Sequence, residues 1–149
     1  MSSSTQVVGA VVVASSLMLS ACQAPAPAPH GGEEPSHIEH IEGTDLTRVT
    51  ITEKAAERID LQTTEVFERV MPRSTAPATC VPYSSLIYDS EGNTWVYVSD
   101  EPRSFVREAV VVDYIVGDVA VLSSGPSVGT VVAAVGVAEL YGTEFEVGH

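Results

Sequence analysis

Three histidines lie close together in the sequence among several glutamates, and these side chains are the group best suited to bind a metal ion. His30, His37 and His40 are interspersed with Glu33 and Glu34. Imidazole and carboxylate groups together bind Zn²⁺ or Cu²⁺. In a helical segment, His37 and His40 would share a face with one of the glutamates a turn earlier. The competing interpretation is a solvated acidic segment without metal, because ordering a flexible segment around an ion costs conformational entropy.

The remaining polar residues give little support for enzyme chemistry. Ser84 and Ser85 have no histidine near them in the sequence, and His149 is the one histidine beyond the cluster described above. Nucleophilic catalysis needs a base within hydrogen-bond reach of the nucleophile, and no such pattern is visible. We therefore expect a protein that is not an enzyme.

The beginning of the sequence has the pattern of an export signal. Residues 7–19 are almost wholly apolar or small, and residues 19–22 read Leu-Ser-Ala-Cys. An apolar run of this length is short for a membrane span and is typical of a signal peptide, although residues 1–6 lack the usual Lys or Arg. The Leu-Ser-Ala-Cys sequence resembles the lipobox of bacterial lipoproteins, which implies a covalent lipid such as palmitate on Cys22. We expect residues 1–21 to be a signal peptide, and the mature protein to be anchored at the extracytoplasmic face of the cell membrane.

The segment after Cys22 predicts a spacer followed by one domain. After Gln23, residues 24–29 alternate Ala and Pro, which favours an extended polyproline conformation, and the sequence stays polar as far as Gly43. We expect residues 22–43 to be a flexible tether and residues 44–149 to be a β domain. If Cys22 is acylated, Cys80 lacks a disulfide partner in the chain, and a buried core position or a reactive thiol remain its two interpretations.

The charge of the chain restricts its partners. Twenty acidic residues outnumber seven Lys and Arg, which gives a formal net charge of −13. Nucleic acids and anionic lipid surfaces select clusters of Lys and Arg, so we expect no nucleic-acid partner.

Short runs of β-branched and aromatic residues, separated by turn residues, predict a mainly β fold. The pattern favours a small antiparallel β-barrel or sandwich of about six to eight short strands with one or two short helices. Thr52 is a predicted N-cap for a helix over residues 54–59. Three prolines within residues 71–82 predict an irregular connection. The expected strands are residues 46–51, 61–70, 86–89, 94–99, 104–112, 114–116, 119–122 and 130–135, and a final short helix is expected over residues 138–141.

Several segments resemble a known family of transport proteins. Residues 81–88 (Val-Pro-Tyr-Ser-Ser-Leu-Ile-Tyr) and 92–98 (Gly-Asn-Thr-Trp-Val-Tyr-Val) are similar to the C-terminal region of the periplasmic adaptor subunits, or membrane fusion proteins, of RND-type efflux pumps. Residues 124–132 and 135–142 continue the resemblance, and residues 49–63 resemble the strand, helix and strand with which that region of the family begins. The resemblance implies the membrane-proximal β domain of an adaptor.

The chain departs from the family in one large respect. Full adaptors insert a β-barrel, a lipoyl domain and usually a helical hairpin where this chain has only residues 71–80. What the resemblance implies is therefore a lipid-anchored, adaptor-like accessory component of an efflux transporter, which docks on an inner-membrane transporter or on a full-length adaptor. The alternatives are an independent metal-binding or metal-sensing lipoprotein that uses the His- and Glu-rich tether, and an adaptor remnant without a partner.

A set of aromatic residues can lie either in the core or on an exposed docking surface. Alternation on neighbouring strands favours the core, and an exposed docking patch is the alternative. Arg103 and Arg107 flank Phe105 and are the candidates to face a transporter, and the alternative is an exposed strand that carries ordinary surface charges. The aromatic set comprises Tyr83, Tyr88, Trp95, Tyr97 and Phe105.

Overall fold

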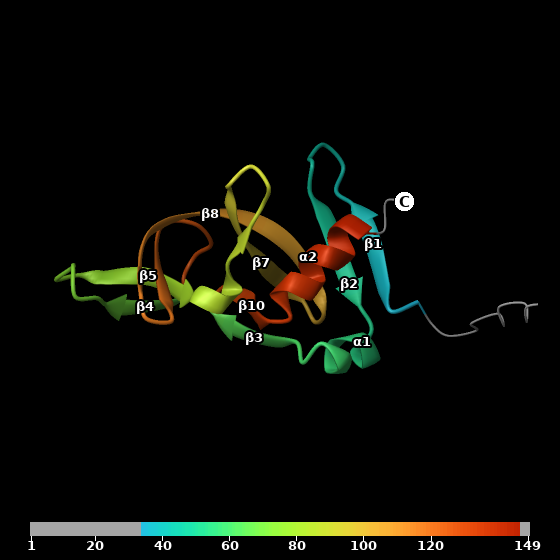
Figure 1. Cartoon of the computed structure of the whole chain (residues 1–149), viewed down its shortest axis with the longest axis horizontal. Coiled ribbons are helices and arrows are strands. Elements are labelled where there is room, and N and C mark those ends of the chain that lie inside the picture. The colour runs from blue at the N-terminus through green and yellow to red at the C-terminus, as the bar shows by residue number, and fades with distance from the viewer. Residues whose placement is uncertain (1–33, 147–149) are drawn as a thin grey trace, which may run out of the picture. The chain divides into compact units, whose positions relative to one another are not determined.

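Alternating β-branched residues build a curled antiparallel sheet in this chain (Figure 1). The computed structural model describes residues 34–146. In chain order the elements are β1 (Ser36–His40), β2 (Thr47–Ile51), α1 (Glu53–Arg58), β3 (Gln62–Glu65), β4 (Phe67–Val70), β5 (Pro77–Pro82), a single turn of 3-10 helix (Tyr83–Ser85), β6 (Ile87–Tyr88), β7 (Thr94–Glu101), β8 (Ser104–Val116), β9 (Val119–Ser124), β10 (Val131–Val135) and α2 (Val137–Glu146).

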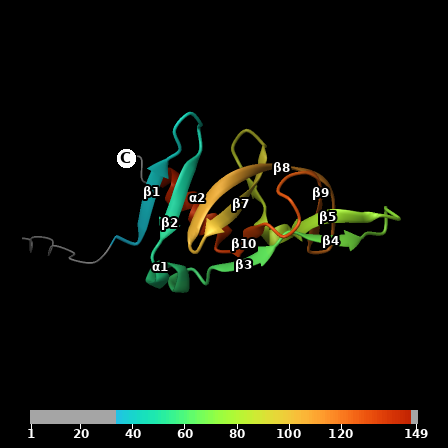
Figure 2. The same ribbon diagram turned by 180° about the vertical axis from the view of Figure 1, so that it is seen from behind.

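The sheet is organised around the long strand β8. Its first half pairs with β7 and β2, and its second half pairs with β9. The full order is β3-β10-β7-β8-β9-β5-β4, with β1 and β2 joined through β8 and with β6 on β7. Early strands therefore pair with late ones, β2 with β8 and β3 with β10. The β1–β2 and β4–β5 hairpins lie at opposite ends of the sheet (Figures 1 and 2).

The predicted fold class is confirmed, since the described residues form a mainly β, antiparallel structure with two short helices. There are ten strands among them, more than expected, because two strands lie in segments that lacked the expected pattern. The predicted cap of α1 is also present, with the Ala55 amide donating to Thr52 Oγ1 at 3.2 Å. The final helix α2 is longer than the predicted residues 138–141.

The predicted start of the domain at residue 44 is wrong. Residues 36–40 form β1, which pairs along its whole length with β2 from Ser36↔Ile51 to His40↔Thr47. The strand forms although most of its residues are polar. Ile38 packs against the core beneath α2, and the backbone of the strand is paired with β2. The predicted signal peptide, Cys22 and the tether as far as residue 33 lie outside the described residues.

The predicted connection over residues 71–82 is also wrong in part, because Pro77–Pro82 forms β5. Its two prolines are the first and last residues of the strand, where a missing N–H disturbs the ladder least. The connection shortens to residues 71–76, and β4 and β5 form a hairpin. The predicted strand 61–70 is divided at Val66, which is buried and bonds through its backbone to Gly129 and Thr130.

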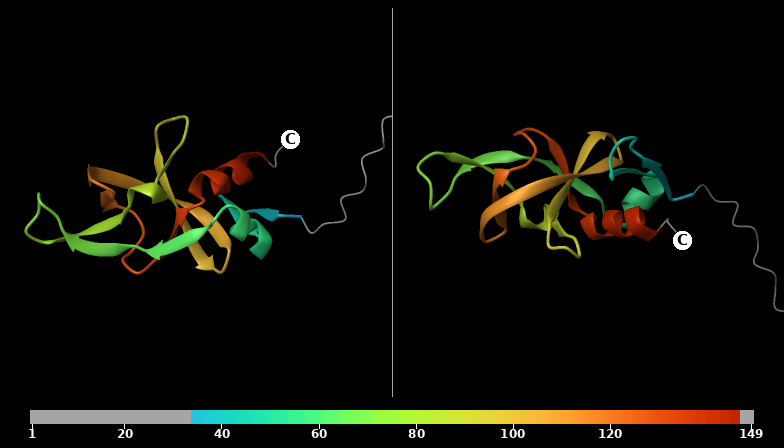
Figure 3. Two further views of the ribbon diagram at one scale, coloured as in Figure 1. Left: turned by 60° about the horizontal axis from the view of Figure 1, so that its bottom comes forward. Right: turned by 90° about the horizontal axis from the view of Figure 1, so that it is seen from above.

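Three clusters of buried side chains hold the sheet together. One of the three clusters, which we name the helix-side core, lies beneath α2. This helix contacts β2 and β6 on one side of the sheet (Figure 3). Within residues 34–146, neither helix is long and apolar enough to cross a membrane. The central core consists of Val66, Val81, Leu86, Val96, Val110, Ala120, Leu122 and Val132; the helix-side core of Val49, Ile51, Tyr97, Phe105, Ala133, Val137 and Leu140; and the hairpin-side core of Met71, Cys80, Val119 and Val121.

Candidate docking surfaces

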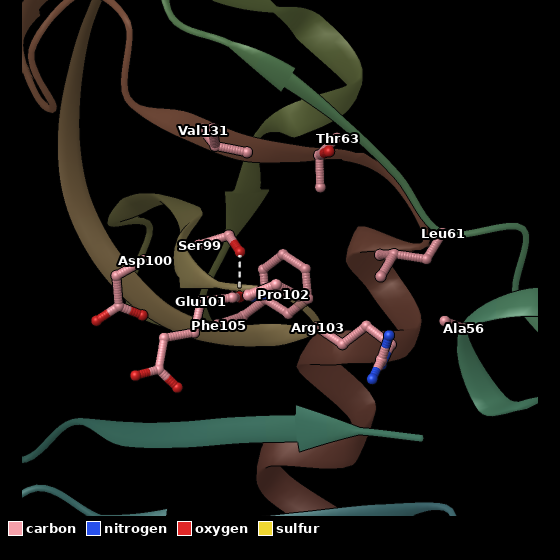
Figure 4. Close-up of a pocket in the computed structure, with 10 residues that line it drawn as sticks. All are labelled: Ala56, Leu61, Thr63, Ser99, Asp100, Glu101, Pro102, Arg103, Phe105 and Val131. Atoms are coloured by element: carbon pink, nitrogen blue, oxygen red, sulfur yellow. Dashed lines mark hydrogen bonds between the residues drawn. The ribbon is translucent and has the colours of Figure 1, made fainter. Parts of the chain in front are cut away.

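The tight turn between β7 and β8 borders a pocket of about 450 Å³ (Figure 4). Arg103 occupies this turn with φ +61°, a conformation that few residues other than glycine adopt. Thr63 of β3 and Val131 of β10 form the opposite wall, and Phe105 lies between the two sides. The pocket is lined by Ala56, Leu61, Thr63, Ser99, Asp100, Glu101, Pro102, Arg103, Phe105 and Val131.

The rim of this pocket carries charges of both signs. Arg48 Nη1 lies 2.8 Å from Asp100 Oδ1, and this hydrogen bond lowers the pKa of Asp100 and raises that of Arg48. In Figure 4 the Asp100 and Glu101 carboxylates extend away from Thr63, whereas the Arg103 side chain extends toward α1. Arg103 takes part in neither of the two salt bridges formed within residues 34–146. Its side chain is exposed.

Phe105 does not belong to an exposed docking patch, so the predicted set of Arg103, Phe105 and Arg107 is corrected. The Phe105 side chain is 1% exposed and packs in the helix-side core opposite Val49. Alternation along β8 places Arg107 on the same face as Phe105, where α2 covers it. Of the three predicted residues, only Arg103 is accessible at the surface.

Arg107 forms a buried ion pair with the last turn of α2. Its Nε donates to Glu144 Oε1 at 2.8 Å, and the two side chains are 9% and 2% exposed. Tyr97 donates its hydroxyl to Glu144 Oε2 at 2.5 Å. The Arg107 guanidinium also lies over two rings, 4.6 Å from the centroid of Trp95 and 5.0 Å from that of Phe145. These contacts satisfy both charges away from water, as a buried pair requires.

The protonation of Tyr97 supports this arrangement. Burial, and then the hydrogen bond to Glu144, raise the pKa of the Tyr97 hydroxyl above its ordinary value. Tyr97 therefore stays protonated and acts as a donor throughout the physiological pH range. The network fastens α2 to the sheet, and we interpret it as structural because the carboxylate and the guanidinium are both enclosed.

The other aromatic residues divide between core and surface. Tyr97 is fully buried, as favoured for the set, whereas Tyr83 and Tyr88 are about half exposed. Trp95 is partly buried at the edge of the helix-side core. Cys80 is buried in the hairpin-side core, which agrees with the first of its two interpretations, and burial raises the pKa of its thiol.

The helical arrangement considered for the histidines is wrong where the structure describes them. His37 and His40 lie three apart on β1, and a strand places such residues on opposite faces. Both are exposed, as is Glu34. Within residues 34–146, no group of three or more His, Cys, Asp or Glu is arranged to hold a metal ion. His30 and Glu33 lie outside the described residues.

The sequence interpretation missed Glu144, although a pattern in α2 points to it. Val137, Leu140 and Glu144 follow each other at intervals of three and four, so they share one helical face. A carboxylate on an otherwise apolar face needs a buried cationic or hydrogen-bonding partner. Extending the predicted helix by one turn would have identified it.

Comparison of the sequence with models of known protein families and with curated proteins gave no match.

Proposed function

We propose that this chain is a lipid-anchored, extracytoplasmic accessory component of an efflux transporter, which acts by docking its β domain on a membrane partner. The partner would be the inner-membrane transporter or a full-length periplasmic adaptor. The protein would carry out no catalysis, and Cys22 would hold it to the membrane. The proposal develops the resemblance to adaptor subunits and the lipobox-like residues 19–22.

The observation that carries this proposal is the pairing of early strands with late ones. In the adaptor family, the membrane-proximal domain is assembled from segments before and after the inserted domains. Here β2 pairs with β8 and β3 pairs with β10, so the segment of residues 47–65 is built into the same sheet as the segment of residues 104–135. This is the arrangement expected if the middle of an adaptor were absent.

The β4–β5 hairpin supports the same interpretation. Residues 71–76 close the chain where an adaptor would leave this domain, and the turn is stabilised by the Ser74 amide donating to the Met71 carbonyl at 2.9 Å. Phe67 pairs with Cys80, and Val70 pairs with Pro77. The two segments are thus joined by a short ordered hairpin, which leaves a self-contained domain for docking.

The pocket at the β7–β8 turn is the surface that we assign to this docking. It combines apolar walls with the exposed Arg103 guanidinium and the Glu101 carboxylate. A partner could therefore bury apolar surface there and also form charged contacts. Charged groups at the rim of an interface contribute mainly to specificity and association rate.

The test is to crosslink intact cells, solubilise the membranes, and isolate the chain through a C-terminal tag to identify the attached proteins by mass spectrometry. Recovery of one transporter or adaptor with the wild type, and its loss with Arg103→Glu but not with the control Arg58→Glu, is the expected result. Arg58 is an exposed arginine at the end of α1 and does not line the pocket. Recovery of the lipoprotein alone would refute the docking function.

A further inference from the structure

A second surface lies where β8 leaves β7, and we name it the Trp95 groove. Its volume is about 600 Å³, and it is lined by Gly92, Asn93, Thr94, Trp95 and residues 109–112. Trp95 pairs with Ala109 across β7 and β8, so their side chains share the face that α2 covers farther along. Val111 is 57% exposed. An apolar floor therefore continues beyond the end of α2 without a covering element among the described residues.

Trp95 is held in one orientation before any partner arrives. Its indole Nε1 donates to Asp89 Oδ2 at 2.9 Å, and Arg107 lies over its ring at 4.6 Å. Asp89 is itself fixed, because its other oxygen accepts from the backbone amides of Glu91 and Asn93. A side chain already fixed in the free protein loses little conformational entropy on binding. The groove is thus preorganised.

Most of the charges around the groove are negative. Residues 74–102 and 108–149 contain no Lys or Arg. Arg107, which lies between these stretches, is enclosed and paired with Glu144. Glu91 in the loop before β7 is exposed, and so is Asp113, which follows residues 109–112 on β8. Glu108 pairs with Val96 and therefore lies on the other face of the sheet. Arg73 contacts β8 beyond the groove, 4.8 Å from the centroid of the Tyr114 ring. An apolar floor flanked by exposed carboxylates is complementary to a basic chain that also carries aliphatic groups.

We propose that the Trp95 groove docks a basic segment of a partner protein, in which Lys or Arg side chains alternate with aliphatic ones. The aliphatic groups would lie on Trp95, Ala109 and Val111, and the cations would face Glu91 and Asp113. This inference rests on the proposed docking function and adds a second contact surface of defined chemistry to the pocket at Arg103.

Trp95 is the only tryptophan in the chain, so its fluorescence reports on the groove directly. The probe is a synthetic hexapeptide of alternating Leu and Arg with blocked ends, titrated into the purified chain in neutral detergent. The control peptide has Gln in place of Arg. We expect a saturable fluorescence change with the Arg peptide alone, and an affinity that falls on the order of tenfold when the ionic strength rises from 0.03 to 0.3 M.

Two matched variants test the floor of the groove. Val111→Asp should weaken peptide binding at least about tenfold, because it removes apolar contact area from the centre of the surface. Val128→Asp, at a residue that is 48% exposed on the turn before β10, should bind like the wild type. Near-ultraviolet circular dichroism of both variants checks that the fold is retained. Equal binding by Val111→Asp and the wild type, binding that is insensitive to salt, or no binding at millimolar peptide would each overturn the proposal.

The crosslinking experiment separates this inference from the proposed function. If Val111→Asp is folded and still recovers the partner as efficiently as the wild type, the groove is not the contact, although the docking function stands. If the wild type itself recovers no partner, the docking function fails whatever the peptide does.

Discussion

Replacing Glu144 with glutamine removes one charge from the buried network while keeping the shape of the side chain. The change leaves Arg107, 9% exposed, without a counter-ion next to it. A hydrogen bond to a charged group contributes about 1.5–3 kcal/mol, and breaking a buried ion pair costs about 3–5 kcal/mol. The rings of Trp95 and Phe145 retain part of the stabilisation of the guanidinium, at about 1 kcal/mol each. We therefore expect Glu144→Gln to lower the free energy of unfolding by about 2–4 kcal/mol.

The assay is urea denaturation monitored by Trp95 fluorescence, which is sensitive because the indole stacks on Arg107. The unfolding midpoint should fall without a change in slope, since the surface exposed on unfolding stays the same. The control is the double variant Arg107→Met with Glu144→Leu, in which no buried charge is left unpaired. Because Glu144→Leu also removes the acceptor of the buried Tyr97 hydroxyl, the double variant is made together with Tyr97→Phe. Its stability should lie within about 1 kcal/mol of that of Tyr97→Phe alone, which is the behaviour of replaced buried pairs.

Two outcomes would refute this reasoning. A loss below about 0.5 kcal/mol for Glu144→Gln would mean that the pair is solvated and contributes as little as a surface pair. Equal losses for the single and the double variant would mean that packing of α2, rather than pairing of charge, sets the cost. The single variants Arg107→Met and Glu144→Leu complete a double-mutant cycle, which distinguishes the two explanations because it isolates the coupling between the two side chains.

Two further predictions come from other parts of the structure, and a third comes from the sequence around Cys22. Asp89→Asn should destabilise the protein at neutral pH. Hydrogen bonds, chiefly from the Asn93 side chain, lower the pKa of Asp89 to about 2. The ionised carboxylate therefore stabilises the fold above the unfolded pKa of 3.8, and this stabilisation is lost as the pH falls toward about 2. Urea midpoints of both proteins across this range should converge at low pH. Gly136→Ala should lower the thermal midpoint more than Gly43→Ala, because both glycines have positive φ but only a Cβ at Gly136 meets Ile59 at 3.2 Å. Cys22→Ser should move the chain from the membrane fraction to the soluble fraction on cell fractionation, and a wild-type distribution would contradict lipid anchoring.

The features of the fold that could be predicted are those that residues close together in the sequence determine. Thr52 caps α1 because its hydroxyl reaches the Ala55 amide within three residues. Gly92 and Gly117 lie in turns between predicted strands, and both adopt the positive φ that glycine allows. The alternation of residues 94–99 is confirmed in β7. Each of these features depends only on neighbours in the sequence.

The parts that the sequence could not predict depend on distant partners. Strand β1 has a polar sequence and forms because β2 supplies a ladder for it. Strand β5 begins and ends with proline, and this pattern predicts a loop. Only its pairing with β4 and β9 identifies the segment as a strand. Arg107 resembled a surface residue of a charged strand, and its role became visible only with Glu144, 37 residues farther along the chain.

The pairing of β2 with β8 also sets the order of events when the chain folds. Arg48 bonds to Ser104, which lies 56 residues later, and β3 has its ladder partner in β10, nearly at the end of the described chain. Contacts between residues so far apart in the sequence close large loops, and the chain loses conformational entropy before the contacts stabilise it. We therefore expect folding to be slow compared with that of a helical bundle of similar size. During synthesis, β2 and β3 leave the ribosome long before β8 and β10 have been made. Strand β2 can pair with β1 in the meantime, whereas β3 has no ladder partner until β10 has been synthesised.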